Sequence, residues 1–395
     1  MSVVGFDLER LVSELLGLVR AEVSDEPAVP LWRASFGELE REVVLACLDA
    51  GEVSSVGPQV TELEQRVAAF VGARHGVAMV NGTNALQLAL QLAGVGRDCE
   101  VITQALSFVA TSNVVAYLSA RPVFVDVERS TLGMAPQALA NFLEAFGERR
   151  EDGCYNRHSG RRLAACLPMH TFGHPCRIDE IAAICAAWGI PLVEDAAESL
   201  GSWYQGRHTG TFGGLGVFSF NGNKVITTGG GGMIVTDDEA LARRARHLST
   251  TAKLPHPYEY VHDEVAYNWR MPNLNAALGC AQMERLPSLL AARRELALRY
   301  AEFFAERGIQ FVAEPPGASS NHWLNAIVMD SREERDALLQ ACNAAGVNAR
   351  AIWQLMTDLP MYADCQRDGL GVSGEMVGRV VCLPSWREGQ DQGAR

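Results

Sequence analysis

Short apolar segments alternate with helical segments from about residue 34, and this alternation constrains the fold more than any other feature of the chain. Two of the apolar segments, residues 78–80 and 123–125, have a length that suits buried strands better than helices. Buried strands that alternate with helices are typical of a mainly parallel sheet with helices on both faces. We therefore predict an α/β fold, with further strands at 101–102, 164–167, 192–194, 217–220 and 233–235 and helices at 85–93, 109–118 and 178–188.

The pattern changes after about residue 254, where longer helical segments begin. Helices at 275–283 and 286–306 come before short apolar strands, and a helix at 333–345 comes after them. This order predicts a second, smaller α/β domain over residues 255–395, with strands at 309–312 and 326–329. We expect its last residues, 388–395, to form a disordered tail.

The first 29 residues differ from the alternating region. Residues 6–21 place leucine and valine along one side of a helix, and two prolines in 24–30 indicate a linker. We therefore predict a helical appendage and linker at 1–29, followed by a large domain at 30–254. Within that domain, Thr61-x-x-Glu64 has the spacing of a capping box and predicts the start of a helix.

Composition narrows the classes of function. The formal net charge is −13, which disfavours nonspecific binding to nucleic acid but leaves anionic small molecules open. The ten cysteines form no Cys-x-x-Cys pair, so we expect reduced thiols, a cytoplasmic protein and no metal site. His170 and His174 straddle a turn without a carboxylate or cysteine at ligand spacing, and we interpret them as structural.

Lys224 is the strongest indication of chemistry. It lies among uncharged residues just before four glycines, where desolvation favours the neutral amine that attacks a carbonyl. Asp195 ends an apolar strand, and Ser219 comes five residues before the lysine. Alone, Lys224 suits a surface loop and Asp195 a helix cap. Together they favour a pyridoxal-phosphate (PLP) site, in which a carboxylate keeps the ring nitrogen protonated and the serine contacts the phosphate.

Two further features fit the carboxyl edge of a parallel sheet, where ligands collect. Gly82-Thr83-Asn84 follows a short strand, and free N–H groups at such a helix start attract a phosphate. The same tripeptide is also a good helix start without any ligand. Phe108 could stack on the pyridine ring, although a core aromatic fits the position equally well. No Gly-x-Gly-x-x-Gly follows an early strand, which disfavours a dinucleotide site.

These residues together resemble the nucleotide-sugar aminotransferases of the DegT/DnrJ/StrS group. The resemblance covers about residues 30–385 and rests on Gly82-Thr83, Glu194-Asp195-Ala196-Ala197, Ser219-x-x-x-x-Lys224 and Tyr267-Asn268-x-Arg270-Met271. It implies PLP fold type I, the aspartate-aminotransferase-like fold. It also implies roles by position: Lys224 as the imine-forming lysine, Asp195 on the pyridine nitrogen, Ser219 on the phosphate, Phe108 as the stacking aromatic, Glu198 near the cofactor hydroxyl, and Asn268 reaching the phosphate of a neighbouring subunit.

The resemblance also implies the reaction. Glutamate would convert the cofactor to pyridoxamine phosphate, and the amine would pass to C4 of a nucleotide-linked 4-keto-6-deoxy hexose, with ping-pong kinetics. The closer similarity is to the bacillosamine and legionaminic-acid branch of polysaccharide biosynthesis, and it implies a homodimer with shared active sites. Substrate contacts would come from Ser55, Lys253, Arg270, Trp323 and Arg350, with Trp353 as a second platform.

Two other functions fit part of this pattern. One is another enzyme of the same fold, such as a 3-ketosugar aminotransferase or a lyase, because the fold alone does not fix the reaction. The other is a noncatalytic PLP-binding regulator, which would normally carry a basic DNA-reading module that this chain does not show. The loop at 30–36 departs from the usual pattern of the branch, so the nucleotide stays open.

Overall fold

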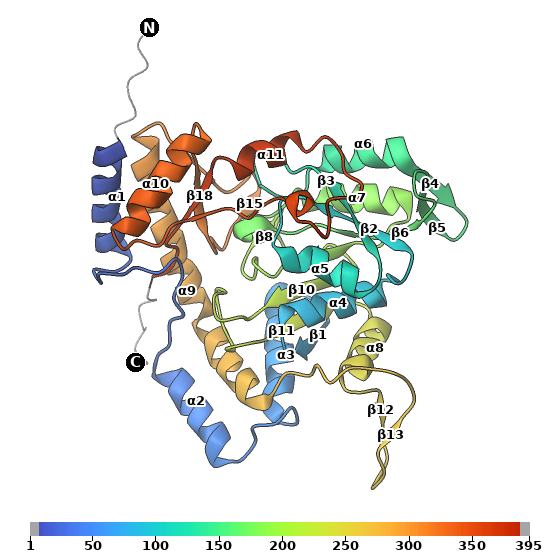
Figure 1. Ribbon diagram of the computed structural model, residues 1–395. Coiled ribbons are helices and arrows are strands. Elements are labelled where there is room, and N and C mark those ends of the chain that lie inside the picture. Colours follow the sequence, from blue (N-terminus) through green and yellow to red (C-terminus); the bar gives the residue numbers. More distant parts are fainter. Residues whose placement is uncertain (1–7, 388–395) are drawn as a thin grey trace.

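A mainly parallel sheet forms the centre of the molecule. The computed structural model describes residues 8–387. The parallel bridges Cys166–Leu192 and Met169–Asp195 join two smaller sheets into one. Its seven central strands run in one direction except β11, which is antiparallel to both neighbours. The order of these central strands is β3 (Arg121–Val125), β2 (Cys99–Gln104), β6 (Arg162–Leu167), β7 (Val193–Asp195), β10 (Leu215–Ser219), β11 (Gly232–Thr236) and β1 (His75–Met79). Figure 1 labels all of them except β7. The hairpin of β5 (Gly153–Asn156) and β4 (Gly147–Arg150) extends the sheet from the start of β6, and β5 is antiparallel to β6.

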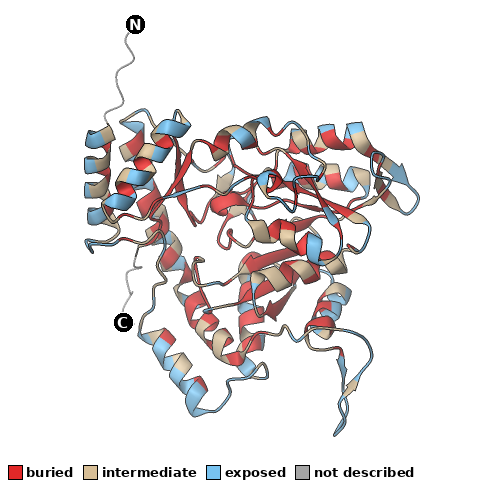
Figure 2. Ribbon diagram, viewed as in Figure 1, coloured by how far each residue is buried: buried red, intermediate tan, exposed pale blue. Residues whose placement is uncertain are grey.

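Helices cover both faces of this sheet because its strands alternate their side chains between two apolar clusters. In β1, Val77 and Met79 join the cluster that contains α4 and α8, whereas Ala78 joins the cluster of α3. Burial is therefore concentrated in the strands and the inner helix faces, as Figure 2 shows in red. The covering helices are α3 (Pro58–Val71), α4 (Gly82–Leu92), α5 (Val109–Tyr117), α6 (Pro136–Phe146), α7 (Ile178–Trp188) and α8 (Glu239–Ser249). The predicted α/β fold with a mainly parallel sheet is confirmed.

The C-terminal part contains a second sheet, which is antiparallel and lies beside the long helix α9 (Asn273–Ala305). Helix α10 (Arg332–Ala344) covers it, and α1 (Leu8–Glu22) packs against α10 through Leu11, Leu15 and Val19. The order of strands is β14 (Gln310–Phe311), β16 (Asn325–Val328), β18 (Val380–Leu383) and β17 (Arg350–Ala351). The helix predicted at 6–21 is therefore present from residue 8, and the tail predicted at 388–395 lies outside the described residues.

Helix α9 corrects one prediction. The sequence indicated two helices, 275–283 and 286–306, but the structure has one continuous helix with Pro287 inside it. A proline in a helix interior removes one hydrogen bond and costs about 3 kcal/mol. Leu286 and Leu289, on either side of Pro287, are buried in the same apolar cluster. Burial on both sides of the proline offsets the lost hydrogen bond, so the helix stays continuous.

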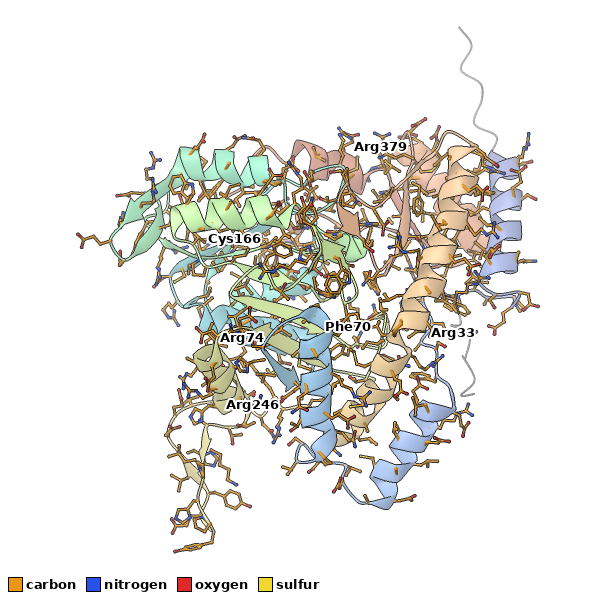
Figure 3. All side chains as sticks on the ribbon, turned by 180° about the vertical axis from the view of Figure 1, so that it is seen from behind. Arg33, Phe70, Arg74, Cys166, Arg246 and Arg379 are labelled. Atoms are coloured by element: carbon orange, nitrogen blue, oxygen red, sulfur yellow. The ribbon has the colours of Figure 1, made fainter. Side chains whose placement is uncertain are left out.

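Helix α3 corrects another. It begins at Pro58 after the N-cap Gly57, not at Thr61, so Thr61 and Glu64 form no capping box. Glu64 Oε1 instead accepts a 2.9 Å hydrogen bond from the Ala78 N–H. Its other oxygen lies 2.7 Å from Arg246, which Figure 3 labels. The spacing that indicated a cap thus belongs to a carboxylate that ties α3 to β1 and α8.

The remaining elements lie at the edges of the fold. The small hairpin of β12 and β13 lies at the end of an arm that projects away from α8 in Figure 1. None of the described helices is both long and apolar enough to cross a membrane. These elements are α2 (Glu38–Asp49), β4 (Gly147–Arg150), β5 (Gly153–Asn156), β8 (Trp203–Tyr204), β9 (Arg207–His208), β12 (Lys253–Leu254), β13 (Val261–His262), β15 (Ala318–Ser319), α11 (Gly371–Val377) and the 3-10 turns Thr171–Gly173 and Met356–Asp358.

Candidate active site

A pocket of about 590 Å³ opens at the carboxyl ends of the central strands. Asp195 and Ser219, the last residues of β7 and β10, lie in its wall, together with residues that follow β1 and β6. The topology therefore brings to one edge of the sheet residues that are far apart in the sequence. Ten predicted site residues line this pocket: Gly82, Thr83, Phe108, Asp195, Glu198, Ser219, Lys224, Trp323, Arg350 and Trp353.

Lys224 lies in the tight turn that follows β10. Its backbone N–H donates to the Asn221 carbonyl at 3.0 Å, which closes the turn and directs the residue toward the pocket wall. Its Nζ lies 3.3 Å from Glu198 Oε1 and 4.0 Å from the ring centroid of Trp323. Only 13% of the side chain is exposed. The pocket thus contains a nearly buried amine, the group that can attack an aldehyde once it is neutral.

Asp195 is a buried carboxylate at the end of β7. Its Oδ2 accepts a 2.7 Å hydrogen bond from the Thr111 hydroxyl, and its Oδ1 accepts one of 3.2 Å from the Ala197 N–H. Burial raises the pKa of this carboxyl, while those hydrogen bonds oppose the rise. A carboxylate held in this way can face a ring nitrogen and keep a proton on it.

Glu198 comes three residues after Asp195 in the chain and is also buried. Its Oε2 accepts a 2.9 Å hydrogen bond from the Phe172 N–H, and its Oε1 faces Lys224. Burial raises the pKa of Glu198 to about 7, while the lysine charge opposes the rise. The pocket wall therefore carries two buried carboxyl groups beside one lysine side chain.

The start of α4 can receive an anion. Asn81 caps this helix by accepting the Asn84 N–H at 2.7 Å, and the N–H groups of Gly82 and Thr83 have no acceptor within the helix. Gly82 is required here because a Cβ on it would approach Ser219 Cβ to 2.9 Å. Backbone amides and a serine hydroxyl gathered at a helix N-terminus suit a phosphate group. Amine, carboxylate and anion site together fit PLP.

Aromatic side chains form the rest of the wall. Phe108 is half exposed, and its ring lies 6.3 Å from that of Trp353. Phe172 lies 5.2 Å from Trp353 and has a left-handed backbone (φ 59°), which positions its N–H for Glu198. Sequence reasoning missed Phe172 and also Leu31, Trp32 and Cys382 as pocket residues. The sequence signal for Trp32 was its place in the unusual loop at 30–36.

Four predicted site residues lie outside this pocket: Ser55, Lys253, Arg270 and Asn268. Lys253 is exposed on β12, with its Nζ over the ring of Tyr260 at 4.3 Å. Asn268 is exposed and pairs with Thr250, and Arg270 pairs with Met79 in isolated bridges. None of the four lines the pocket of its own chain.

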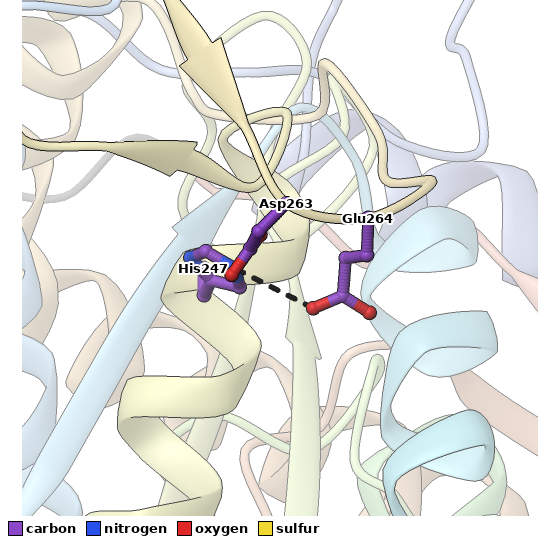
Figure 4. A group of neighbouring side chains, drawn as sticks. All are labelled: His247, Asp263 and Glu264. Carbon is purple, nitrogen blue, oxygen red and sulfur yellow. Dashed lines mark hydrogen bonds and ion pairs between the residues drawn. The ribbon is translucent and has the colours of Figure 1, made fainter.

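The histidines interpreted as structural are fully buried. The Cys176 N–H points at His170 Nδ1 over 3.1 Å, so that nitrogen is unprotonated, and Nε2 donates to Glu194 at 3.1 Å. Away from the pocket, His247, Asp263 and Glu264 lie close together (Figure 4). His247 Nε2 lies 2.8 Å from Asp263, and Glu264 pairs with Arg244, so ion pairs between α8 and the projecting arm account for this cluster.

Comparison with known proteins agrees with this geometry. The family model of the DegT/DnrJ/EryC1/StrS aminotransferases matches residues 35–394. EpsN of Bacillus subtilis (strain 168), which carries the name of a PLP-dependent aminotransferase, is 35% identical over 88% of each chain. GDP-perosamine synthase of Caulobacter vibrioides is 33% identical over 89% of this chain and 91% of its own. The crystal structure of the aminotransferase TlmJ from Streptoalloteichus hindustanus superposes with a TM-score of 0.82 at 29% identity, covering 91% and 94% of the two chains. The chain belongs to the DegT/DnrJ/EryC1/StrS family of PLP-dependent aminotransferases and has their type I fold.

Proposed function

We propose that the protein transfers an amino group from glutamate to C4 of a nucleotide-linked 4-keto-6-deoxy hexose. The observation that carries this proposal is the pocket in which Lys224 and Asp195 meet the start of α4. PLP, when bound, supplies an aldehyde that takes up the amino group and a ring that accepts electrons. Family membership requires that cofactor, and this pocket contains the side chains suited to hold it.

The residues of the chain divide the work by position. Lys224 would attach the cofactor and then move a proton at the reacting carbon, because it is the lysine among the residues that line the pocket. Asp195 would hold the proton on the ring nitrogen. The N–H groups of Gly82 and Thr83 and the Ser219 hydroxyl would bind the phosphate. Phe108 would cover one face of the ring.

The proposed substrate is anionic and carries a sugar. Arg350 lies at the pocket with an exposed guanidinium, which can pair with a diphosphate, and Trp323 and Trp353 offer flat apolar surfaces. The name of the relatives called GDP-perosamine synthase indicates a GDP-linked sugar. The structure of DesI, which is 27% identical with a TM-score of 0.79, was solved in the presence of its TDP-sugar product. These relatives use different bases, so the proposal specifies a nucleoside diphosphate without the base. We also propose that the chain acts in the bacillosamine and legionaminic-acid branch, and this part of the proposal rests on the resemblance of the sequence motifs alone.

We also propose a homodimer with shared sites. Apolar side chains are exposed on two segments that flank the central sheet, the region of α2 and the projecting arm. A monomer rarely exposes so many in two places, and burial against a second copy would remove them from water. They are Leu45, Leu48, Val53 and Val56 near α2, and Tyr258, Tyr260 and Val265 on the arm, with exposures from 43% to 94%.

The absorption spectrum tests the first half of the reaction. Purified protein with PLP should show a visible band that bleaches when glutamate is added and returns when a suitable ketosugar is supplied. A panel of UDP-, GDP- and TDP-linked 4-keto and 3-keto sugars then identifies the acceptor from the return of the band. Return only with a 3-keto sugar would contradict the C4 assignment. Return with 3-keto precursors of an aminobenzoic acid would contradict a sugar substrate, since a neighbour at 26% identity is 3-amino-5-hydroxybenzoic acid synthase.

A further inference from the structure

Glu198 is the only described carboxylate within ion-pair distance of Lys224 Nζ, at 3.3 Å. The carboxylate is fixed from its other side, because Oε2 accepts the N–H of Phe172. The backbone carbonyl of Glu198 also accepts the Asn321 amide at 2.8 Å. Hydrogen bonds thus fix both the main chain and the side chain of Glu198, and its Oε1 faces Lys224.

Other charged and titratable groups lie around the pair of Lys224 and Glu198. Asp195 adds a second buried negative charge, and the Cys382 thiol lies in the pocket wall on β18. Arg350 is exposed, so solvent screens its charge. Trp323 presents its ring to Nζ, and the face of an aromatic ring attracts a cation. When Nζ loses its proton, the Glu198 carboxylate loses its cation in a buried site, where an unpaired charge is costly.

We propose that Glu198 sets the protonation state of the Lys224 nitrogen. Its carboxylate holds a proton on that nitrogen, and it is the nearest acceptor when the nitrogen must become free. In that step the N–H bond of Nζ breaks, an O–H bond forms on Oε1, and the pair goes from two opposite charges to none. The proposal rests on the proposed attachment of PLP to Lys224, because the nitrogen matters only as the point of attachment.

The experiment is a spectroscopic pH titration of the full-length holoenzyme without substrate. The visible band of the bound cofactor changes with the protonation of the nitrogen that joins it to the lysine. Glu198→Gln keeps the shape of the side chain and removes its charge. Because an opposite charge at this range changes a pKa by about 1 to 3 units, the midpoint should shift to lower pH by about one unit or more. Glu198→Asp, which keeps the charge, should restore much of the wild-type midpoint.

Glu64→Gln is the matched control. Glu64 is also a buried carboxylate with a cation beside it, Arg246, but it lies outside the pocket. The midpoint of the pH titration in Glu64→Gln should equal that of the wild type. An unchanged midpoint in Glu198→Gln, with the band still present, would overturn the inference and leave the role of Lys224 intact. Absence of any lysine-dependent band in the wild type would overturn the proposed site itself, and the inference with it.

Discussion

The Thr111 hydroxyl donates a 2.7 Å hydrogen bond to Asp195 Oδ2, and both residues are buried. Thr111 lies in the first turn of α5, whereas Asp195 ends β7. The hydrogen bond therefore joins a helix to a strand that comes much later in the chain. The carboxylate also accepts the Ala197 N–H. These two donors fix the direction of the carboxylate before any ligand is present.

We therefore predict graded losses from three variants at this pair. Asp195→Asn removes the charge that would hold a proton on the cofactor ring, and kcat should fall by about 10² to 10⁴. Thr111→Val removes only one donor, which costs about 1 to 3 kcal/mol when the carboxylate is left short of a partner. Its kcat should fall less, and Thr111→Ser, which keeps the hydroxyl, should stay close to wild type. Steady-state kinetics measures all three. Equal rates for Asp195→Asn and wild type would contradict the role of Asp195.

Two substitutions at Lys224 separate its charge from its chemistry. Lys224→Arg keeps a cation for Glu198 and for the ring of Trp323, but a guanidinium cannot attach the cofactor. Lys224→Ala removes both functions. Turnover should fall by about 10³-fold or more in each variant, whereas Lys224→Arg should retain more thermal stability. Activity assays and thermal unfolding supply the two measurements. A Lys224→Arg protein with near-normal turnover would show that the amine is not required.

Local patterns predicted the strands and most helices because burial repeats at a fixed period along them. The helix predicted at 178–188 matches α7, and the strand at 164–167 lies within β6. The capping box at Thr61 was wrong because its spacing is shared by a carboxylate that reaches β1 from inside α3. Local spacing cannot distinguish a cap from a contact with a distant strand.

The pocket shows a similar division. Asp195 and Ser219 end strands, and Lys224 follows Ser219 by five residues, so the pattern identified all three. The partners that define their chemistry come from elsewhere: Thr111 from α5, and Phe172 from the turn after β6. Phe172 is in a left-handed conformation that no residue preference predicts. Contacts of this kind depend on the packing of whole elements and are absent from the sequence pattern.

Acid should destabilise the protein through His174. Both of its ring nitrogens are buried and have no hydrogen-bond partner in the described part of the chain. Burial lowers the pKa of His174 to about 3, from the ordinary histidine value of 6.5. Because the folded pKa is lower, the stability is complete above about pH 6.5 and is lost as the pH falls toward 3. The unfolding free energy should fall by up to about 1.4 kcal/mol per pH unit from this group.

Denaturant unfolding between pH 7 and pH 5 checks this slope. His174→Leu should flatten it, and comparison of slopes rather than absolute stabilities removes the effect of the altered packing. Burial also lowers the pKa of His208, to about 4, so part of the slope should persist in the variant. His158→Leu is the control, since this histidine is exposed. Equal slopes in His174→Leu and wild type would contradict the assignment.

Helix α1 should be an integral part of the C-terminal core. Leu15 is fully buried in the cluster that contains Tyr300 and Leu338, and Arg307 pairs with Glu14 at 2.6 Å. Leu15→Ala should lower the unfolding free energy by about 2 to 5 kcal/mol, whereas Ser13→Ala, at an exposed position, should change it little. Denaturant unfolding measures both variants. Equal stability in the two would show that α1 only rests on the fold.

The proposed sharing of sites between subunits can be tested with heterodimers of two variant chains. Asn268 is exposed and lies outside the pocket of its own chain, whereas Lys224 lies inside it. If Asn268 serves the neighbouring pocket, a heterodimer of Lys224→Ala and Asn268→Ala chains has one doubly damaged site and one intact site. Co-expression with two affinity tags isolates this heterodimer, which should show about half the wild-type activity per dimer. A heterodimer of Lys224→Ala and Asp195→Asn chains is the control, because both residues belong to one pocket and neither site is intact. Low activity in both heterodimers would contradict the role of Asn268 across the interface.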